Sequence, residues 1–164
     1  MMTPAACCRA ACLALSLALS AGTACAGPTS TEARIFAASG VAAAKIAPCV
    51  ARLDQLGEEL ERLLAAAGAE PRAEAIQAFL HARILRGRYE PGASDLGEVL
   101  EGGPFNCVSA TVLYVLLAER CGLKATAMSV PGHVWCRIEG PPLLDIECTS
   151  REGFSIRAKY AGVP

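Results

Sequence analysis

Three short segments in the second half of the chain carry residue types that could together perform thiol chemistry. Asn106-Cys107 begins a run of apolar residues, His133 follows a Pro-Gly pair, and Asp145 and Glu147 stand two residues apart further on. A thiol can attack a carbonyl carbon, an imidazole can act as its general base, and a carboxylate can orient the imidazole. Cys107, His133, Asp145 and Glu147 are therefore the candidate catalytic residues.

Cys107 is expected at a position that favours the thiolate form of a cysteine. Asn106 is a good N-cap residue, which puts Cys107 in the first turn of a helix. Unpaired backbone N–H groups and the helix dipole stabilise an anion there. Gly102 and Gly103 leave this helix end open to a substrate, and the Cys107 N–H is a candidate oxyanion donor.

Strand pairing decides which carboxylate lies nearer to His133. Pro141 and Pro142 cannot supply ladder N–H groups, so the strand after them begins no earlier than Leu143. Pairing Ile138 with Leu144 then makes Glu147 the diagonal neighbour of His133 on the same face. Asp145 lies about 7 Å further along that strand. We therefore prefer Glu147 as the residue that orients His133, and Asp145 is the alternative.

A zinc site is the rival interpretation of a cluster of cysteine, histidine and acidic residues. The chain after residue 26 has no Cys-x-x-Cys pair, and Cys136 leaves the opposite strand face from His133 because the two are three residues apart. We therefore expect neither a metal nor a cofactor. His81 is expected to be a structural histidine, because no metal-ligating side chain stands at a suitable spacing on its helix face.

The elements that position these residues follow from apolar periodicity. Helical spacing predicts helices over 50–68, 71–87 and 107–120, with one short helix around 95–100. Alternating apolar residues predict strands over 124–130, 132–138 and 143–149. Helices followed by strands, with one helix leading into the sheet, are typical of an α+β fold with a small antiparallel sheet.

Length and charge exclude several classes of protein. The 164 residues fit one domain, and a net charge of −1 without blocks of like charge argues against a sequence-independent nucleic-acid binder. Although 53% of the residues are hydrophobic, no stretch offers the roughly 18 apolar residues of a spanning helix. We therefore expect a soluble domain with an apolar N-terminal segment and no nucleic-acid partner.

The first 26 residues have the features of an export signal. Arg9 is the only charged residue, residues 10–21 are apolar, and Ala24-Cys25-Ala26 offers small residues at a cleavage site. Alternatively, cleavage before Cys25 would leave a lipidated cysteine, the only expected link to a membrane. Residues 27–47 are expected to form a tether that leads into a weak helix, and 48–164 the folded domain. The protein is thus expected in the periplasm, secreted, or lipid-anchored in the cell envelope.

Cleavage at residue 26 would remove four of the nine cysteines. The other five are Cys49, Cys107, Cys121, Cys136 and Cys148. An odd number in an oxidising compartment implies a free thiol or an intermolecular bridge. The strand register above places Cys136 and Cys148 diagonally, so it predicts no disulfide between them.

Together the three segments resemble a known family. Asn106-Cys107, Gly132-His133-Val134-Trp135 and Asp145-Ile146-Glu147-Cys148-Thr149 are similar to the three motifs of the transglutaminase-like superfamily, a papain-related fold with a Cys-His-Asp triad. The resemblance covers residues 95 to about 154. It implies that Cys107 is the nucleophile and His133 the base. Glu147 stands where the family usually has Asp before x-Thr, a departure that keeps Asp145 a candidate.

This resemblance implies a function for the chain. We expect an exported thiol hydrolase or acyltransferase, acting on an amide of a peptide or protein through a thioester intermediate, and more like a peptidase or amidase than a cross-linker. The alternative is a non-catalytic binding or scaffold domain of the cell envelope that keeps the fold. The glutamate at 147, the small size and the oxidising compartment favour this alternative.

Overall fold

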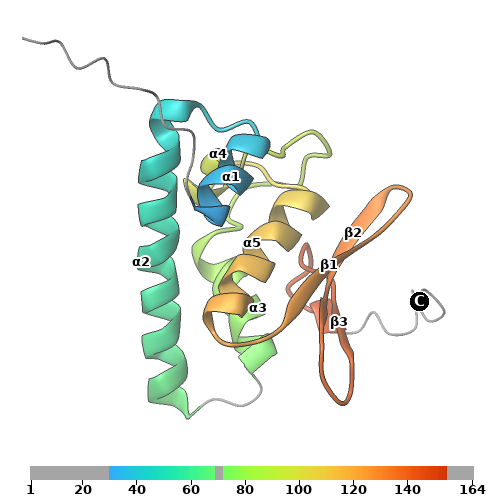
Figure 1. The fold of residues 1–164 in the computed structure, drawn as a ribbon. Coiled ribbons are helices and arrows are strands. Elements are labelled where there is room, and N and C mark those ends of the chain that lie inside the picture. The colour runs from blue at the N-terminus through green and yellow to red at the C-terminus, as the bar shows by residue number, and fades with distance from the viewer. Residues whose placement is uncertain (1–29, 69–71, 155–164) are drawn as a thin grey trace, which may run out of the picture.

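The computed structural model describes residues 30–68 and 72–154, so the expected export signal and Cys25 lie outside the described part (Figure 1). Five helices precede a three-stranded antiparallel sheet of order β1-β2-β3, which confirms the α+β prediction. The elements are α1 (Thr31–Ala38), α2 (Ala43–Ala67), α3 (Arg72–Arg83), α4 (Leu96–Leu100), α5 (Cys107–Arg120), β1 (Ala125–Val130), β2 (His133–Ile138) and β3 (Leu144–Ile146). None of the helices in these two ranges is long and apolar enough to cross a membrane.

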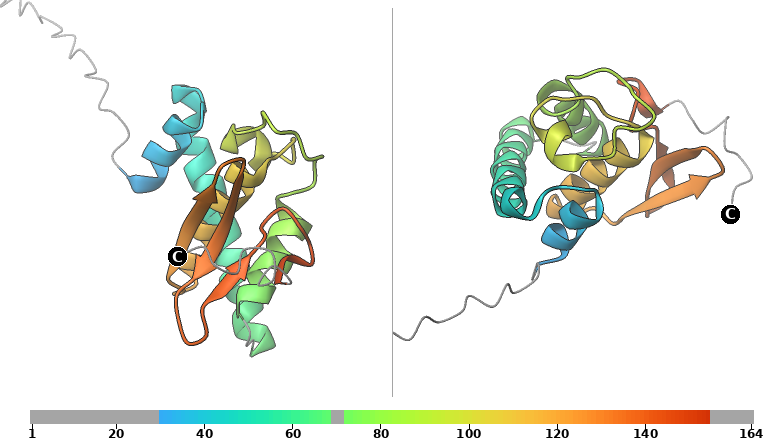
Figure 2. Two further views of the ribbon diagram at one scale, coloured as in Figure 1. Left: turned by 90° about the vertical axis from the view of Figure 1, so that its right-hand side faces the viewer. Right: turned by 90° about the horizontal axis from the view of Figure 1, so that it is seen from above.

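Helix α5 forms the centre of the domain. It lies between the other helices and the sheet, with α3 on one side and β1 and β2 on the other (Figures 1 and 2). Leu113, Tyr114 and Leu117 of α5 are fully buried, and burying each such side chain contributes about 1.5–3 kcal/mol. The predicted helix over 107–120 is therefore confirmed, and its burial fixes the position of its N-terminus.

The segment before α2 differs from the expected tether. Ser30 caps α1 by accepting a hydrogen bond from the Ala33 N–H, and Phe36 of α1 is fully buried. Helix α2 begins at Ala43 and continues through Pro48. A proline inside a helix removes one backbone hydrogen bond and crowds the carbonyl four residues before it, and the buried leucines of α2 offset that cost. The alanine-rich composition of this segment gave no sign that Phe36 and Val41 would lie in the core.

The sheet has the predicted register. Strands β1 and β2 pair with Val130 opposite His133, and β2 pairs with β3 through Ile138↔Leu144 and Cys136↔Ile146. Strand β3 ends at Ile146, earlier than the predicted residue 149.

A local turn explains the early end of β3. The Glu147 N–H donates to the Gly153 carbonyl at 2.9 Å, and the Ser150 N–H donates to the Glu147 carbonyl at 3.2 Å. A Cβ on Gly153 would lie 2.3 Å from the Glu147 oxygen, so this close approach requires glycine. The chain therefore folds back on itself directly after the last paired residue of the sheet.

Candidate active site

Cys107 is the first residue of α5, as predicted. The Asn106 side chain accepts a hydrogen bond from the Ser109 N–H at 2.9 Å, and the Ser109 hydroxyl accepts one from the Asn106 N–H at 2.9 Å. This reciprocal capping box fixes the first turn of α5. The same two side chains donate to the carbonyls of Pro91 and Ala93. The loop before α4 is thereby attached to the helix end that carries the thiol.

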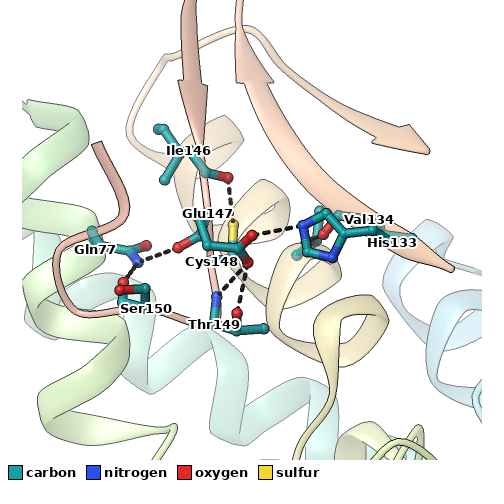
Figure 3. A network of polar contacts seen from close by, with 9 residues as sticks. Gln77, His133, Val134, Ile146, Glu147, Cys148, Thr149 and Ser150 are labelled. Carbon is teal, nitrogen blue, oxygen red and sulfur yellow. Dashed lines mark hydrogen bonds and ion pairs between the residues drawn. The ribbon is translucent and has the colours of Figure 1, made fainter. Parts of the chain in front are cut away.

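Glu147 lies in direct contact with His133. Its Oε2 is 2.6 Å from the Nε2 of His133, and their side chains are only 14% and 21% exposed (Figure 3). The other carboxylate oxygen, Oε1, accepts from the Thr149 hydroxyl at 2.6 Å and from the Thr149 N–H at 3.3 Å. Because both oxygens are engaged, the carboxylate has one orientation, and that orientation points at the imidazole.

Asp145 has a different partner. It lies opposite Arg137 on β2, and its two oxygens accept from the Arg137 Nε at 2.7 Å and Nη2 at 3.0 Å. Arg137 is four residues, or about 13 Å, further along β2 than His133. Of the two carboxylates weighed from the sequence, the structure therefore brings Glu147 to His133 and assigns Asp145 to a bidentate ion pair.

A hydrogen bond joins α5, one turn after Cys107, to β2, one residue after His133. The Thr111 hydroxyl donates to the carbonyl of Val134, the residue after His133, at 3.4 Å. Thr111 is four residues after Cys107, so the two side chains share one face of α5. Since the Nε2 of His133 lies against Glu147, Nδ1 is the ring nitrogen that can act as a base toward a thiol on this face.

Trp135 supports the imidazole from the same face of β2. Its side chain is fully buried, and its ring stacks on that of His133 with centroids 6.2 Å apart and planes 13° from parallel. Residues two apart in a strand share a face, so the His-x-Trp spacing predicts this neighbourhood. The stacked Trp135 ring and the Glu147 carboxylate therefore both restrict the orientation of the imidazole ring.

Tyr89 is a neighbour of Cys107 that the sequence did not indicate. Its backbone forms a parallel bridge with Phe105, and the two rings meet edge to face at 6.1 Å. Desolvation of the Tyr89 hydroxyl, followed by its interaction with the nearby Cys107 thiol and then the Glu147 charge, raises the pKa of this half-exposed side chain. No local sequence pattern predicts that Tyr89 lies near Cys107, because the bridge joins two separate loops.

The remaining described cysteines are unsuited to nucleophilic chemistry. All five described cysteines, Cys107 included, are free, so the absence of a Cys136–Cys148 disulfide agrees with the predicted register. Cys107 is partly exposed, whereas Cys49, Cys121, Cys136 and Cys148 are buried. Burial raises the pKa of each buried thiol, that of Cys136 to about 12. Within residues 30–68 and 72–154, no group of three or more His, Cys, Asp or Glu side chains could hold a metal ion.

Comparison with known protein families yields a match over most of the chain. The family described as the transglutaminase-like superfamily matches residues 47–153. This range begins within α2, ends at the turn after β3, and includes Cys107, His133 and Glu147. No curated protein and no solved structure matched the chain.

Proposed function

The chain belongs to the transglutaminase-like superfamily, and from this premise we propose that it is a thiol enzyme that cleaves or transfers the acyl group of a peptide or protein amide. Cys107 is the nucleophile, His133 the general base and acid, and Glu147 the carboxylate that orients the imidazole. The proposal needs no cofactor, because each step is a proton transfer or an addition at a carbonyl carbon.

In the first half-reaction, the Cys107 sulfur forms a bond to the carbonyl carbon of the amide, and the thiol proton goes to His133. The Cys107 N–H, at the start of α5, is positioned to donate to the oxygen that becomes negative. The C–N bond then breaks, and His133 returns its proton to the leaving amine. The product of this half-reaction is a thioester on Cys107 and a free amine.

In the second half-reaction, water or an amine attacks the thioester carbon while His133 accepts its proton. The Cys107 sulfur leaves as the thiolate and regains the proton from His133. Hydrolysis releases a carboxylic acid, and attack by an amine releases a new amide. We favour hydrolysis, in line with the peptidase or amidase expectation.

The contact between His133 and Glu147 is the observation that carries this proposal. A glutamate where the family usually has aspartate had favoured a non-catalytic scaffold. Its carboxylate is nevertheless 2.6 Å from the imidazole, and Thr149 holds it in that orientation. The longer side chain therefore retains the contact with the base, so the glutamate, one of three features that favour the scaffold alternative, is compatible with catalysis.

An acyl-directed activity probe tests the proposal. The probe should label Cys107 of the folded protein, as shown by peptide mapping, and Cys107→Ala should abolish labelling. Cys136→Ala is the matched control, because it removes a buried thiol and should leave labelling unchanged. Labelling that survives in Cys107→Ala, or a folded protein that takes up no probe, would favour the binding-domain alternative.

We also propose that the protein acts outside the cytoplasm, after export through the segment 1–26. The composition of that segment supports the proposal: one charge, an apolar run and a small-residue cleavage site. Mass spectrometry of protein from a Gram-negative host should find a start at Gly27 or a lipidated Cys25. A purified protein that retains residues 1–20 would contradict export.

A further inference from the structure

Resting on the proposed function, we propose that Gln77 and His81 of α3 are positioning residues for catalysis, which hold the backbone after β3 so that the Glu147 carboxylate reaches His133. Neither residue belongs to the three motifs, and both lie one turn apart on the same helix face. They act on Glu147 through main-chain carbonyl groups and not through the carboxylate itself.

Gln77 bridges two carbonyls of the turn that follows β3. Its Nε2 donates to the Glu147 oxygen at 3.0 Å and to the Ser150 oxygen at 2.5 Å (Figure 3). The residue is 1% exposed, and its Oε1 has no hydrogen-bond partner among the described residues. Both contacts with the turn are therefore made by the amide nitrogen of this buried side chain.

His81 adds a third contact from the next turn of α3. Its Nε2 lies 3.1 Å from the carbonyl oxygen of Cys148 and 3.3 Å from the Nε2 of Gln77. The tautomer that carries its proton on Nε2 donates to this carbonyl. Helix α3 thus holds three carbonyls of one short segment, those of residues 147, 148 and 150. Each donor is buried, so a lost contact would not be replaced by bulk water without cost.

These contacts matter for catalysis because Glu147 lies outside the sheet. Strand β3 ends at Ile146, so no ladder partner fixes the Glu147 backbone. Its N–H donates to Gly153 and its carbonyl accepts from Gln77. With both peptide groups held, the side chain can keep the 2.6 Å contact with His133. A shift of about 1 Å in such a contact can cost 100-fold in rate.

The test compares four variants of the full chain by two readouts. Gln77→Met removes both N–H donors with little change of shape, His81→Leu removes one, and His81→Gln restores a donor. Tyr114→Phe is the matched control, because it deletes a different buried hydrogen bond to α3, the 3.0 Å bond to the Ala73 carbonyl. The readouts are the alkylation rate of Cys107 by iodoacetamide and the tautomer of His133 by long-range proton–nitrogen NMR, where two histidines give readily assigned signals.

If Gln77 positions Glu147, Gln77→Met should slow alkylation of Cys107 by about 10-fold or more. It should also raise the share of the His133 tautomer that is protonated at Nδ1. His81→Leu should act in the same direction, His81→Gln should recover most of the wild-type rate, and Tyr114→Phe should change neither readout. In a Glu147→Gln background, Gln77→Met should cause no further loss, because both changes act through one contact. Additive losses, or wild-type values for both readouts in Gln77→Met, would overturn the inference.

The two readouts separate this inference from the proposed function. If wild-type Cys107 reacts no faster than Cys107 of His133→Ala, the enzyme proposal fails. The His133 tautomer still reports whether α3 holds Glu147 against the imidazole, so the structural part of the inference is decided separately. If the thiol is activated but Gln77→Met leaves the rate and tautomer unchanged, the inference fails while the enzyme proposal stands.

Discussion

Glu147 Oε2 lies 2.6 Å from His133 Nε2, although the strand that leads to Glu147 ends one residue earlier, at Ile146. The contact therefore depends on the turn after the strand as much as on the sheet. Thr149 holds the second carboxylate oxygen, and α3 holds the surrounding carbonyls. Glu147 is therefore held by contacts with His133, Thr149 and α3, although its backbone is not paired in the sheet.

Amide substitutions at the two acidic residues distinguish their roles. Glu147→Gln should slow acylation of Cys107 by at least about 10-fold, because a neutral amide stabilises the imidazolium less than a carboxylate does. Asp145→Asn should leave the rate within about twofold, because Asp145 pairs with Arg137. It should instead lower the free energy of unfolding by about 1–3 kcal/mol. Acylation kinetics and urea unfolding of both variants check this. The reverse pattern would make Asp145 the residue that orients His133.

Iodoacetamide should modify one thiol of the folded domain at neutral pH. Burial raises the pKa of Cys49, Cys121, Cys136 and Cys148, whereas Cys107 is partly exposed at a helix N-terminus. Peptide mapping after brief alkylation should therefore find the label on Cys107 and, after unfolding in urea, on all five. Rapid modification of a buried cysteine before unfolding would show that the domain opens there.

Loss of the α5 cap should affect both stability and thiol reactivity. Asn106→Ala removes the capping bond with Ser109 and the bond to Pro91, so the free energy of unfolding should fall by about 1–2 kcal/mol. Alkylation of Cys107 should slow as the first turn frays. Ser30→Ala is the control, because it removes the cap of α1, away from the site. It should lower stability without slowing alkylation, and equal slowing in both variants would contradict a local role for Asn106.

The stability of the fold should depend on pH through His81. Burial, opposed by hydrogen bonds to carbonyls and assisted by the charge of Arg151, lowers the pKa of His81. Below its ordinary value of about 6.5, the unfolded chain therefore binds more protons than the folded one. The free energy of unfolding should fall as the pH drops from about 6.5 toward the lower folded pKa. His81→Gln should flatten that part of the curve in urea titrations, and an unchanged slope would show that other groups cause it.

Local patterns were sufficient for the central features of the site. Residues close together in the sequence predict three of these features: the Asn106 cap, the burial of α5 and the turn at the prolines after β2. They placed Cys107 in a first turn and fixed the Ile138↔Leu144 register. That register favoured Glu147 over Asp145, but the turn that holds Glu147 after the end of β3 was not predicted.

Other features depend on contacts between distant segments. Tyr89 reaches Cys107 through a bridge to Phe105, and Gln77 reaches a turn 70 residues further on. Neither position has a periodic or motif signal of its own. Likewise, the burial of Phe36 shows that one large side chain can bring an alanine-rich segment into the core. Sequence patterns predict local geometry, whereas the positions of Tyr89, Gln77 and Phe36 depend on contacts with distant segments.

The most direct measurement is the rate at which p-nitrophenyl acetate acylates Cys107 in the wild type and in His133→Ala. The wild type should release p-nitrophenol while a single acetyl group appears on Cys107 by mass spectrometry. His133→Ala should slow that step by at least about 10-fold, because the thiol loses its base. Equal rates in the two proteins, or acetylation at another residue, would contradict an activated Cys107 thiol.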